Sequence, residues 1–329
     1  MRAVLLTLVF LAGLGLAGAA AVVTFGLYNV SAQAGHLPGV SWLLHTTFRN
    51  SVALRAPSME DAPPLDDPDL IALGAGHYAT ACAFCHAAPG EARAATAAAM
   101  VPAPPPIEEA VAQWEPNELH WIVENGVKMT GMPGWPVEER GDEVWAVVAY
   151  LVAIQNGQAP KLPEASEGVA YCRTCHEAIA GPVPRLDILS ATYIEDQLGL
   201  YATGVRPSGI MAQAVSVVER EDFAGLAREL AASTTAPTAR AIAGDGAAGE
   251  RLAKQGTRDV PACTACHNGE AGKGPVLHGQ SEAYLAQHLK LWREGTYQHN
   301  AKMLAAARDL SDAEIAALAA WFASLNSEE

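Results

Sequence analysis

The sequence predicts an all-α protein in which an N-terminal transmembrane helix is followed by three small helical domains. The residues from Ala3 to Val30 are uncharged and mostly apolar. A set of spaced residues recurs later in the chain at a constant interval, which indicates an internal repeat. Apolar residues follow helical spacing at the ends of domains, and no run of alternating polarity with hairpin turns predicts strands.

The N-terminal segment, residues 1–30, is predicted to be a membrane anchor. About 20 apolar residues are needed to cross a bilayer, whereas the apolar core of a signal peptide has about 7 to 15. The stretch from Ala3 to Val30 exceeds the first length, so an uncleaved anchor is expected. Cleavage near the small residues Ala17 to Ala20 stays open as an alternative.

Residues 31–67 are rich in proline and are predicted to form a stalk near the membrane surface, with a short amphipathic stretch from Trp42 to Phe48. Loop-like segments at Asn156–Glu164 and Ser233–Ala243 divide the rest of the chain. The predicted domains are residues 68–157, 158–234 and 235–329. Each domain is small for an unassisted hydrophobic core, which suggests that a bound group fills part of its interior.

The second and third domains are predicted to be tandem copies. Ten identical residues recur at a constant offset of 91 and are, in the first copy, Cys172, Cys175, His176, Pro184, Leu186, Ser190, Tyr193, Leu198, Leu200 and Gly204. After one inserted residue the offset becomes 92 and pairs Met211 with Met303. The first domain is a more distant relative, because its middle is longer and contains the proline-rich run Val101–Pro106.

The last segments of the first and third domains are predicted to be helices. Ser311 and Glu314 have the spacing of a capping box and precede an amphipathic run that begins at Ile315. In the first domain, apolar residues from Val144 to Leu151 follow the same helical spacing.

All six cysteines lie in three pairs of equal spacing, and a histidine follows each pair directly. The motifs are Cys82-Ala-Phe-Cys85-His86, Cys172-Arg-Thr-Cys175-His176 and Cys263-Thr-Ala-Cys266-His267. This CxxCH sequence attaches c-type haem through two thioethers, and its histidine ligates the iron. A zinc site or a redox dithiol is the alternative, but both leave the following histidine without a role. The sequence therefore predicts three covalently bound haem c groups.

Each motif is followed by a methionine that is a candidate sixth ligand of the iron. Met211 and Met303 hold equivalent places in the repeat. The first domain offers two methionines, of which Met132 is favoured because the proline after it stiffens the loop, while Met129 stays as an alternative. His299, four residues before Met303, is the histidine to consider as a replacement ligand.

With these features the chain resembles class I cytochromes c. The first domain resembles a membrane-anchored bacterial monohaem cytochrome c in His77–Gly90 and Asn125–Trp135. The second and third domains resemble the halves of a cytochrome c4-type dihaem protein, through Pro275–Gly295 and its weaker copy after Pro184. The resemblance implies a haem motif near the end of each first helix, a closing helix that crosses it, and the ligand pairs His86 and Met132, His176 and Met211, His267 and Met303.

The same resemblance sets an expectation for the second domain. Few residues separate the first domain from Cys172, so the opening helix of the second domain is expected to be short. The second haem is then expected to be more exposed or less regularly ligated than the others.

These features predict an electron-transfer protein rather than an enzyme, because ligation by histidine and methionine leaves no open position on the iron. The leading hypothesis is a carrier between a quinol-oxidising complex and a terminal oxidase or reductase. The alternatives are the electron-acceptor subunit of a periplasmic dehydrogenase, and a haem enzyme such as a peroxidase. Haem c is attached outside the cytoplasm, so the haem domains are expected in the periplasm, tethered to the inner membrane.

The charge of the chain bears on its partners. The net charge of −15 repels nucleic-acid phosphates and excludes nucleic acid as a partner. It predicts redox partners with basic docking faces. No serine–histidine–aspartate set, glycine-rich phosphate loop or carboxylate pair with a recognisable spacing is present in the sequence.

Overall fold

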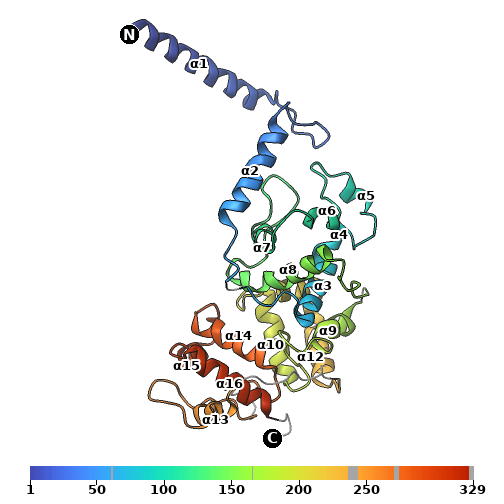
Figure 1. Ribbon diagram of the computed structural model, residues 1–329, viewed down its shortest axis with the longest axis vertical. Coiled ribbons are helices and arrows are strands. Elements are labelled where there is room, and N and C mark those ends of the chain that lie inside the picture. Colours follow the sequence, from blue (N-terminus) through green and yellow to red (C-terminus); the bar gives the residue numbers. More distant parts are fainter. Residues whose placement is uncertain (61, 165, 236–243, 270–273, 326–329) are drawn as a thin grey trace.

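The computed structural model describes the chain except for residues 61, 165, 236–243, 270–273 and 326–329. The described residues form α-helices and short 3-10 helices and no β-strand, which confirms the predicted all-α class. Figure 1 shows α1 projecting away from a helical body, with α2 between them and α13 to α16 at the opposite end. The predicted loop Ser233–Ala243 lies largely outside the described residues.

Helix α1 (Arg2–Phe25) has no buried residue. Its 24 residues are long and apolar enough to cross a membrane. By length and composition these properties fit a membrane span and an N-terminal signal sequence alike.

Helix α2 (Val40–Arg55) is longer than the amphipathic stretch expected in the stalk. Its second half packs on the first domain, where Phe48 meets the Trp114 ring at a centroid distance of 5.5 Å and Val52 is fully buried. The Arg49 guanidinium donates a hydrogen bond of 2.9 Å to the Gln113 side chain. The end of the expected stalk is therefore fixed to the first domain, because its apolar residues find partners there.

The first domain is built around two crossing helices. Its elements are α3 (Pro68–Ala81), α4 (Ala83–His86), α5 (Ala95–Ala98), α6 (Ile107–Val111), α7 (Pro116–Asn125), η1 (Glu138–Arg140) and α8 (Gly141–Gln155). Asp67 caps the N-terminus of α3, and its side chain accepts a hydrogen bond from the Asp69 amide. It packs against α8 at Gly74, where a Cβ would lie only 1.9 Å from the Ala146 carbonyl oxygen. Only glycine permits this approach of the two backbones.

The second and third domains have matching helices. The second contains α9 (Gly168–His176), α10 (Ala191–Ala202), α11 (Gly209–Ser216), η2 (Arg220–Asp222) and α12 (Phe223–Ala231), and the third contains α13 (Gly246–Gln255), η3 (Cys263–Ala265), α14 (Glu282–Arg293), α15 (Ala301–Ala307) and α16 (Asp312–Ser324). Helices α10 and α14 differ by the repeat offset of 91 at both ends. Ser190 and Ser281 cap them in the same way, each accepting a hydrogen bond from an amide three residues on. The repeat found in the sequence is thus present in the structure.

The opening helices of the three domains differ. In the third domain α13 crosses α16 at Gly249, where a Cβ would lie 2.0 Å from the Ala317 carbonyl oxygen. Residues 256–262 then separate α13 from its haem motif, so the motif does not end the first helix as the resemblance implied. In the second domain the opening helix α9 is short, as expected, and contains the motif itself.

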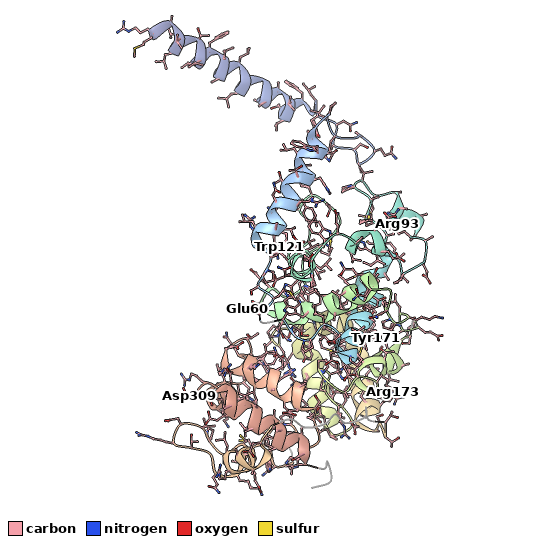
Figure 2. The ribbon with its side chains drawn as sticks, in the orientation of Figure 1. Glu60, Arg93, Trp121, Tyr171, Arg173 and Asp309 are labelled. Atoms are coloured by element: carbon pink, nitrogen blue, oxygen red, sulfur yellow. The ribbon has the colours of Figure 1, made fainter. Side chains whose placement is uncertain are left out.

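The first domain supplies a neighbour for α9. Helix α3 packs against α9 and α11. A Cβ on Gly76 of α3 would lie 3.3 Å from the Cys175 sulfur. Tyr171 of α9 lies at this junction (Figure 2). Leu73 and Ala146 of the first domain also share a buried cluster with Ile179 and Val183 of the second.

Candidate haem sites

The three motif histidines are held in the same way. Each ring nitrogen Nδ1 lies within hydrogen-bond distance of a proline carbonyl oxygen, with distances of 2.8 Å for His86 and Pro105, 2.9 Å for His176 and Pro184, and 2.9 Å for His267 and Pro275. A carbonyl oxygen can only accept, so Nδ1 carries the proton and the lone pair of Nε2 is free. Hydrogen bonding of this kind orients histidines that ligate metals.

Burial keeps these imidazoles neutral. It lowers the pKa of His86, His176 and His267 below the ordinary value, more than the proline carbonyls raise it. A neutral imidazole with an accessible Nε2 is the form that binds iron. The donor set present in the chain therefore fits haem c.

The cysteines fit covalent attachment better than redox or zinc chemistry. None of the six forms a disulfide. Burial raises the pKa of Cys82 to about 12 and that of Cys172 and Cys263 to about 11. Reactive dithiols need a lowered pKa, which these do not have. Among the described residues, no group of three or more histidine, cysteine or acidic side chains could hold a metal ion.

The second site surrounds a large cavity. The cavity has a volume of about 1570 Å³ and is lined by Cys172, Cys175, His176 and Met211, among others. Cofactor pockets commonly measure about 300 to 1,000 Å³, so a porphyrin has room here. Met211 lies on α11, where its amide donates a hydrogen bond of 3.1 Å to the Ser208 hydroxyl that caps the helix. The fold thus brings the candidate methionine to the cavity of its motif.

In the third site, Met303 packs against the same apolar cluster as Cys263. Asn300 caps α15 and accepts a hydrogen bond of 3.1 Å from the Met303 amide. The His299 ring packs against Trp292 in a tilted arrangement at a centroid distance of 4.6 Å, and burial lowers the pKa of His299 to about 4. Its Nδ1 atom is buried and has no hydrogen-bond partner in the part of the chain that the structure describes, so His299 stays the alternative ligand at this site.

In the first site, the turn after His86 is held by Tyr78. Ala87 adopts a φ of 60°, and its carbonyl accepts a hydrogen bond of 2.6 Å from the Tyr78 hydroxyl. On the opposite loop, Met132 is half-buried, and its amide donates to the Thr130 hydroxyl. Met129 is 73% exposed, which favours Met132 as the ligand candidate.

A buried charged cluster where the three domains meet was missed by the sequence analysis. Arg140 is 4% exposed and forms ion pairs of 2.7 Å with Asp142 and 2.8 Å with Glu143. Glu143 accepts a hydrogen bond of 2.6 Å from the Ser208 hydroxyl of the second domain. Arg140 also donates to the Tyr297 hydroxyl of the third domain at 3.2 Å. No motif marks this cluster, because the contacts that join it to Ser208 and Tyr297 link residues far apart in the sequence.

Helical domains built around CxxCH motifs, each with its histidine oriented by a proline carbonyl, define a c-type cytochrome. The family model described as cytochrome c oxidase, cbb3-type, subunit III matches residues 69–151 and 244–322. The thiosulfate dehydrogenase electron acceptor of Stutzerimonas stutzeri (strain A1501) is 36% identical over 205 residues, which cover 56% of this chain and 94% of the relative. The thiosulfate dehydrogenase electron acceptor of Thiomonas intermedia (strain K12) is 34% identical over 195 residues, covering 54% and 84%.

Among solved structures, cytochrome c4 of Acidithiobacillus ferrooxidans is 29% identical, with a TM-score of 0.41, over 44% of this chain and 90% of that one. The chain belongs to the cytochrome c family. It is a haem c electron-transfer protein and not itself an enzyme, in keeping with relatives that are electron acceptors.

Proposed function

We propose that the chain is a membrane-anchored trihaem cytochrome that accepts electrons from a periplasmic thiosulfate dehydrogenase and passes them to the respiratory chain. The observation that carries this proposal is the similarity to two electron acceptors of thiosulfate dehydrogenase, over 94% and 84% of their lengths. It favours the dehydrogenase alternative of the sequence analysis over a carrier between a quinol-oxidising complex and an oxidase.

The proposed haem sites use the motif residues and one methionine each. The cysteine pairs at 82 and 85, 172 and 175, and 263 and 266 attach the porphyrins. The iron ligands are the pairs His86 and Met132, His176 and Met211, and His267 and Met303. The bound haem supplies one-electron redox chemistry, while the chain orients the imidazoles and excludes water from the iron.

The proposed anchor is α1, whose residues have no packing partner in the body. Because α2 is fixed to the first domain, this domain lies nearest the membrane and the third domain lies farthest from it (Figure 1). In this proposal the haem domains lie in the periplasm, where haem c is attached.

The test of the donor is reduction of the purified, haem-loaded chain by thiosulfate in the presence of a thiosulfate dehydrogenase. We expect the haem bands to be reduced with enzyme and thiosulfate together and to stay oxidised with either one alone. A pyridine haemochrome assay should give three haems per chain. Reduction by a quinol-oxidising complex but not by the dehydrogenase would support the carrier hypothesis instead.

The ionic-strength dependence of that reduction tests how the partners meet. The chain carries a net charge of −15, so a partner with a basic face should be steered toward it. The Debye length falls from about 30 Å at 0.01 M salt to about 10 Å at 0.1 M, so the bimolecular rate should fall over this range. A rate that does not change would indicate a permanent complex.

Binding of carbon monoxide tests the saturated ligand sets. The wild-type chain should not bind it, whereas Met211→Ala and Met303→Ala should each open one haem to it. Stoichiometric binding by the wild type would instead favour the peroxidase alternative.

Membrane fractionation tests the anchor. The full chain should stay with membranes through a high-salt wash and be released by detergent. A mature N-terminus near Ala20 would show that the segment is a cleaved signal.

A further inference from the structure

Equivalent residues of the two tandem copies meet where the second and third domains join. Arg206 and Tyr297 are related by the repeat offset of 91, and the Arg206 guanidinium lies 5.2 Å from the centre of the Tyr297 ring. Gln197 and His288 are related by the same offset. The Arg206 guanidinium contacts both, at 2.6 Å from the Gln197 oxygen and 3.3 Å from His288 Nδ1. At this equivalent position the second domain has the cationic Arg206 and the third domain has the neutral Tyr297.

Arg206 is a buried cation without a carboxylate partner among the described residues. It is 6% exposed, and its Nε atom has no hydrogen-bond partner. Its contacts are the neutral side chains above, the Tyr284 hydroxyl at 3.5 Å and the face of the Tyr201 ring at 4.9 Å. By contrast, Arg185 at the same domain interface is paired with Asp187 at 2.5 Å. A guanidinium cannot lose its charge by deprotonation, so a buried one requires an anion.

The cavity of the second site is where this anion would bind. Arg206 lines that cavity together with Cys172, Cys175, His176 and Met211, whereas the motif residues of the third site do not line it. The carboxylates of Asp142 and Glu143 also line this cavity, but both are paired with Arg140. His288, which contacts Arg206, is kept neutral by burial, which lowers its pKa well below the ordinary value.

We propose that Arg206 positions the second haem by binding one of its propionates, and that its charge makes this haem easier to reduce than the third haem. A nearby positive charge stabilises the form that has gained an electron. The third domain lacks this charge because Tyr297 stands at the equivalent position. The inference rests on the proposed function only in requiring a haem at the second site, not in the identity of the donor.

The experiment is a spectroelectrochemical titration of the full, haem-loaded chain that resolves the individual haems. Arg206→Gln should make one haem harder to reduce, by about tenfold in the ratio of its reduced to oxidised forms, which is about 59 mV for a one-electron couple. Arg206→Lys keeps the charge and should restore most of the wild-type potential. Arg220→Gln removes an exposed arginine of the same domain and is the matched control, with no comparable shift expected.

A second variant tests the charge without removing the side chain. The Gln197 amide oxygen lies 2.6 Å from the Arg206 guanidinium, and Gln197→Glu replaces this amide with a carboxylate. The substitution should lower the reduction potential of the same haem that Arg206→Gln affects. This variant keeps the proposal testable even where Arg206→Gln fails to fold. Equal potentials in Gln197→Glu and wild type would overturn the proposal.

The haem that shifts must also be identified. Met211→His and Met303→His each replace the proposed methionine ligand of one haem and so mark the second and third sites in the spectra. The shift should belong to the second haem, and its assignment to the first or third haem would overturn the proposal. If the pyridine haemochrome assay gives fewer than three haems per chain, the proposed trihaem assignment is wrong, and not the role of Arg206.

Discussion

The third domain closes its core with its own opening helix, α13, which crosses α16 at Gly249, whereas the second domain has only the short α9 before its loop and meets α3 of the first domain. Among the described residues, the main cluster of buried apolar residues has six members in the second domain, against eleven in each of the other two. The two copies of the repeat are therefore stabilised by different contacts. The third is packed from its own residues, while the second depends on a neighbour.

The buried charged cluster holds part of the second domain in place. Glu143 lies in the first turn of α8 of the first domain, and its carboxylate accepts hydrogen bonds from the Gly209 amide at 2.6 Å and the Ile210 amide at 3.2 Å, at the start of α11. The helix that carries Met211 is thus held by a residue of another domain. The following predictions test this dependence.

The largest effect is expected for Glu143→Ala. The substitution leaves Arg140 short of one carboxylate and the start of α11 without its acceptor, and breaking a buried ion pair in this way costs about 3 to 5 kcal/mol. Hydrogen exchange should show loss of protection in α9 and α11, with α14 to α16 little changed. The matched control is Glu138→Ala, an exposed glutamate on the neighbouring turn. Equal loss of protection in the third domain would contradict the proposed dependence.

Gly249→Ala tests the helix crossing that the second domain lacks. The added Cβ meets the Ala317 carbonyl oxygen, and overpacking of this kind costs about 3 kcal/mol. Hydrogen exchange measured at increasing guanidinium concentration should show the loss of stability in the third domain. In the second domain, a Cβ on Gly199 of α10 would meet nothing within 4 Å, so Gly199→Ala should be neutral or stabilise by up to about 1 kcal/mol. Similar losses in both variants would show that the two copies pack alike.

Acid should weaken the contact that α3 provides to the second domain. His77 of α3 is 6% exposed and packs against the Trp135 ring in a tilted arrangement at a centroid distance of 4.6 Å, and burial lowers its pKa to about 4. The unfolded chain takes up a proton below about pH 6.5 and the folded chain only near pH 4, so stability falls as the pH drops through this window, by up to about 3 kcal/mol.

The measurement is the free energy of unfolding of wild type and His77→Gln between pH 7 and pH 4. The variant should lose less stability over this range than the wild type. His45→Gln, at an exposed position of α2, is the control and should follow the wild-type profile. A parallel profile for His77→Gln would exclude His77 as a source of the acid sensitivity.

The smallest expected effect is a difference in thermal stability between variants of the equivalent helix caps Ser190 and Ser281. Both accept a hydrogen bond from an amide of their own helix, but the Ser281 hydroxyl also donates to the Gly181 carbonyl of the second domain. Loss of a cap costs about 1 kcal/mol, and loss of a further hydrogen bond about 1 kcal/mol more. Ser281→Ala should therefore lower the thermal midpoint more than Ser190→Ala does. Equal midpoints would mean that the bond between domains contributes nothing.

Much of the site was predictable because its signals are local in the sequence. A haem motif needs two cysteines and a histidine within five residues, and Ser311 and Glu314 form the capping box that their spacing predicted. The repeat paired Pro184 with Pro275, and the structure shows that the carbonyls of these two prolines accept hydrogen bonds from His176 and His267 in the same way. The short opening helix of the second domain also followed from the few residues available before Cys172.

The sequence by itself determined the all-α class, the three motifs and the repeat, because helical periodicity and covalent attachment depend on residues close together in the chain. Only the tertiary structure decided that α2 packs on the first domain, that α3 packs against α9, and that Arg206 is buried with no carboxylate partner among the residues described. These features arise from contacts between residues far apart in the sequence. Their energies depend on burial and on which charges meet, and neither is present in a pattern of residue types.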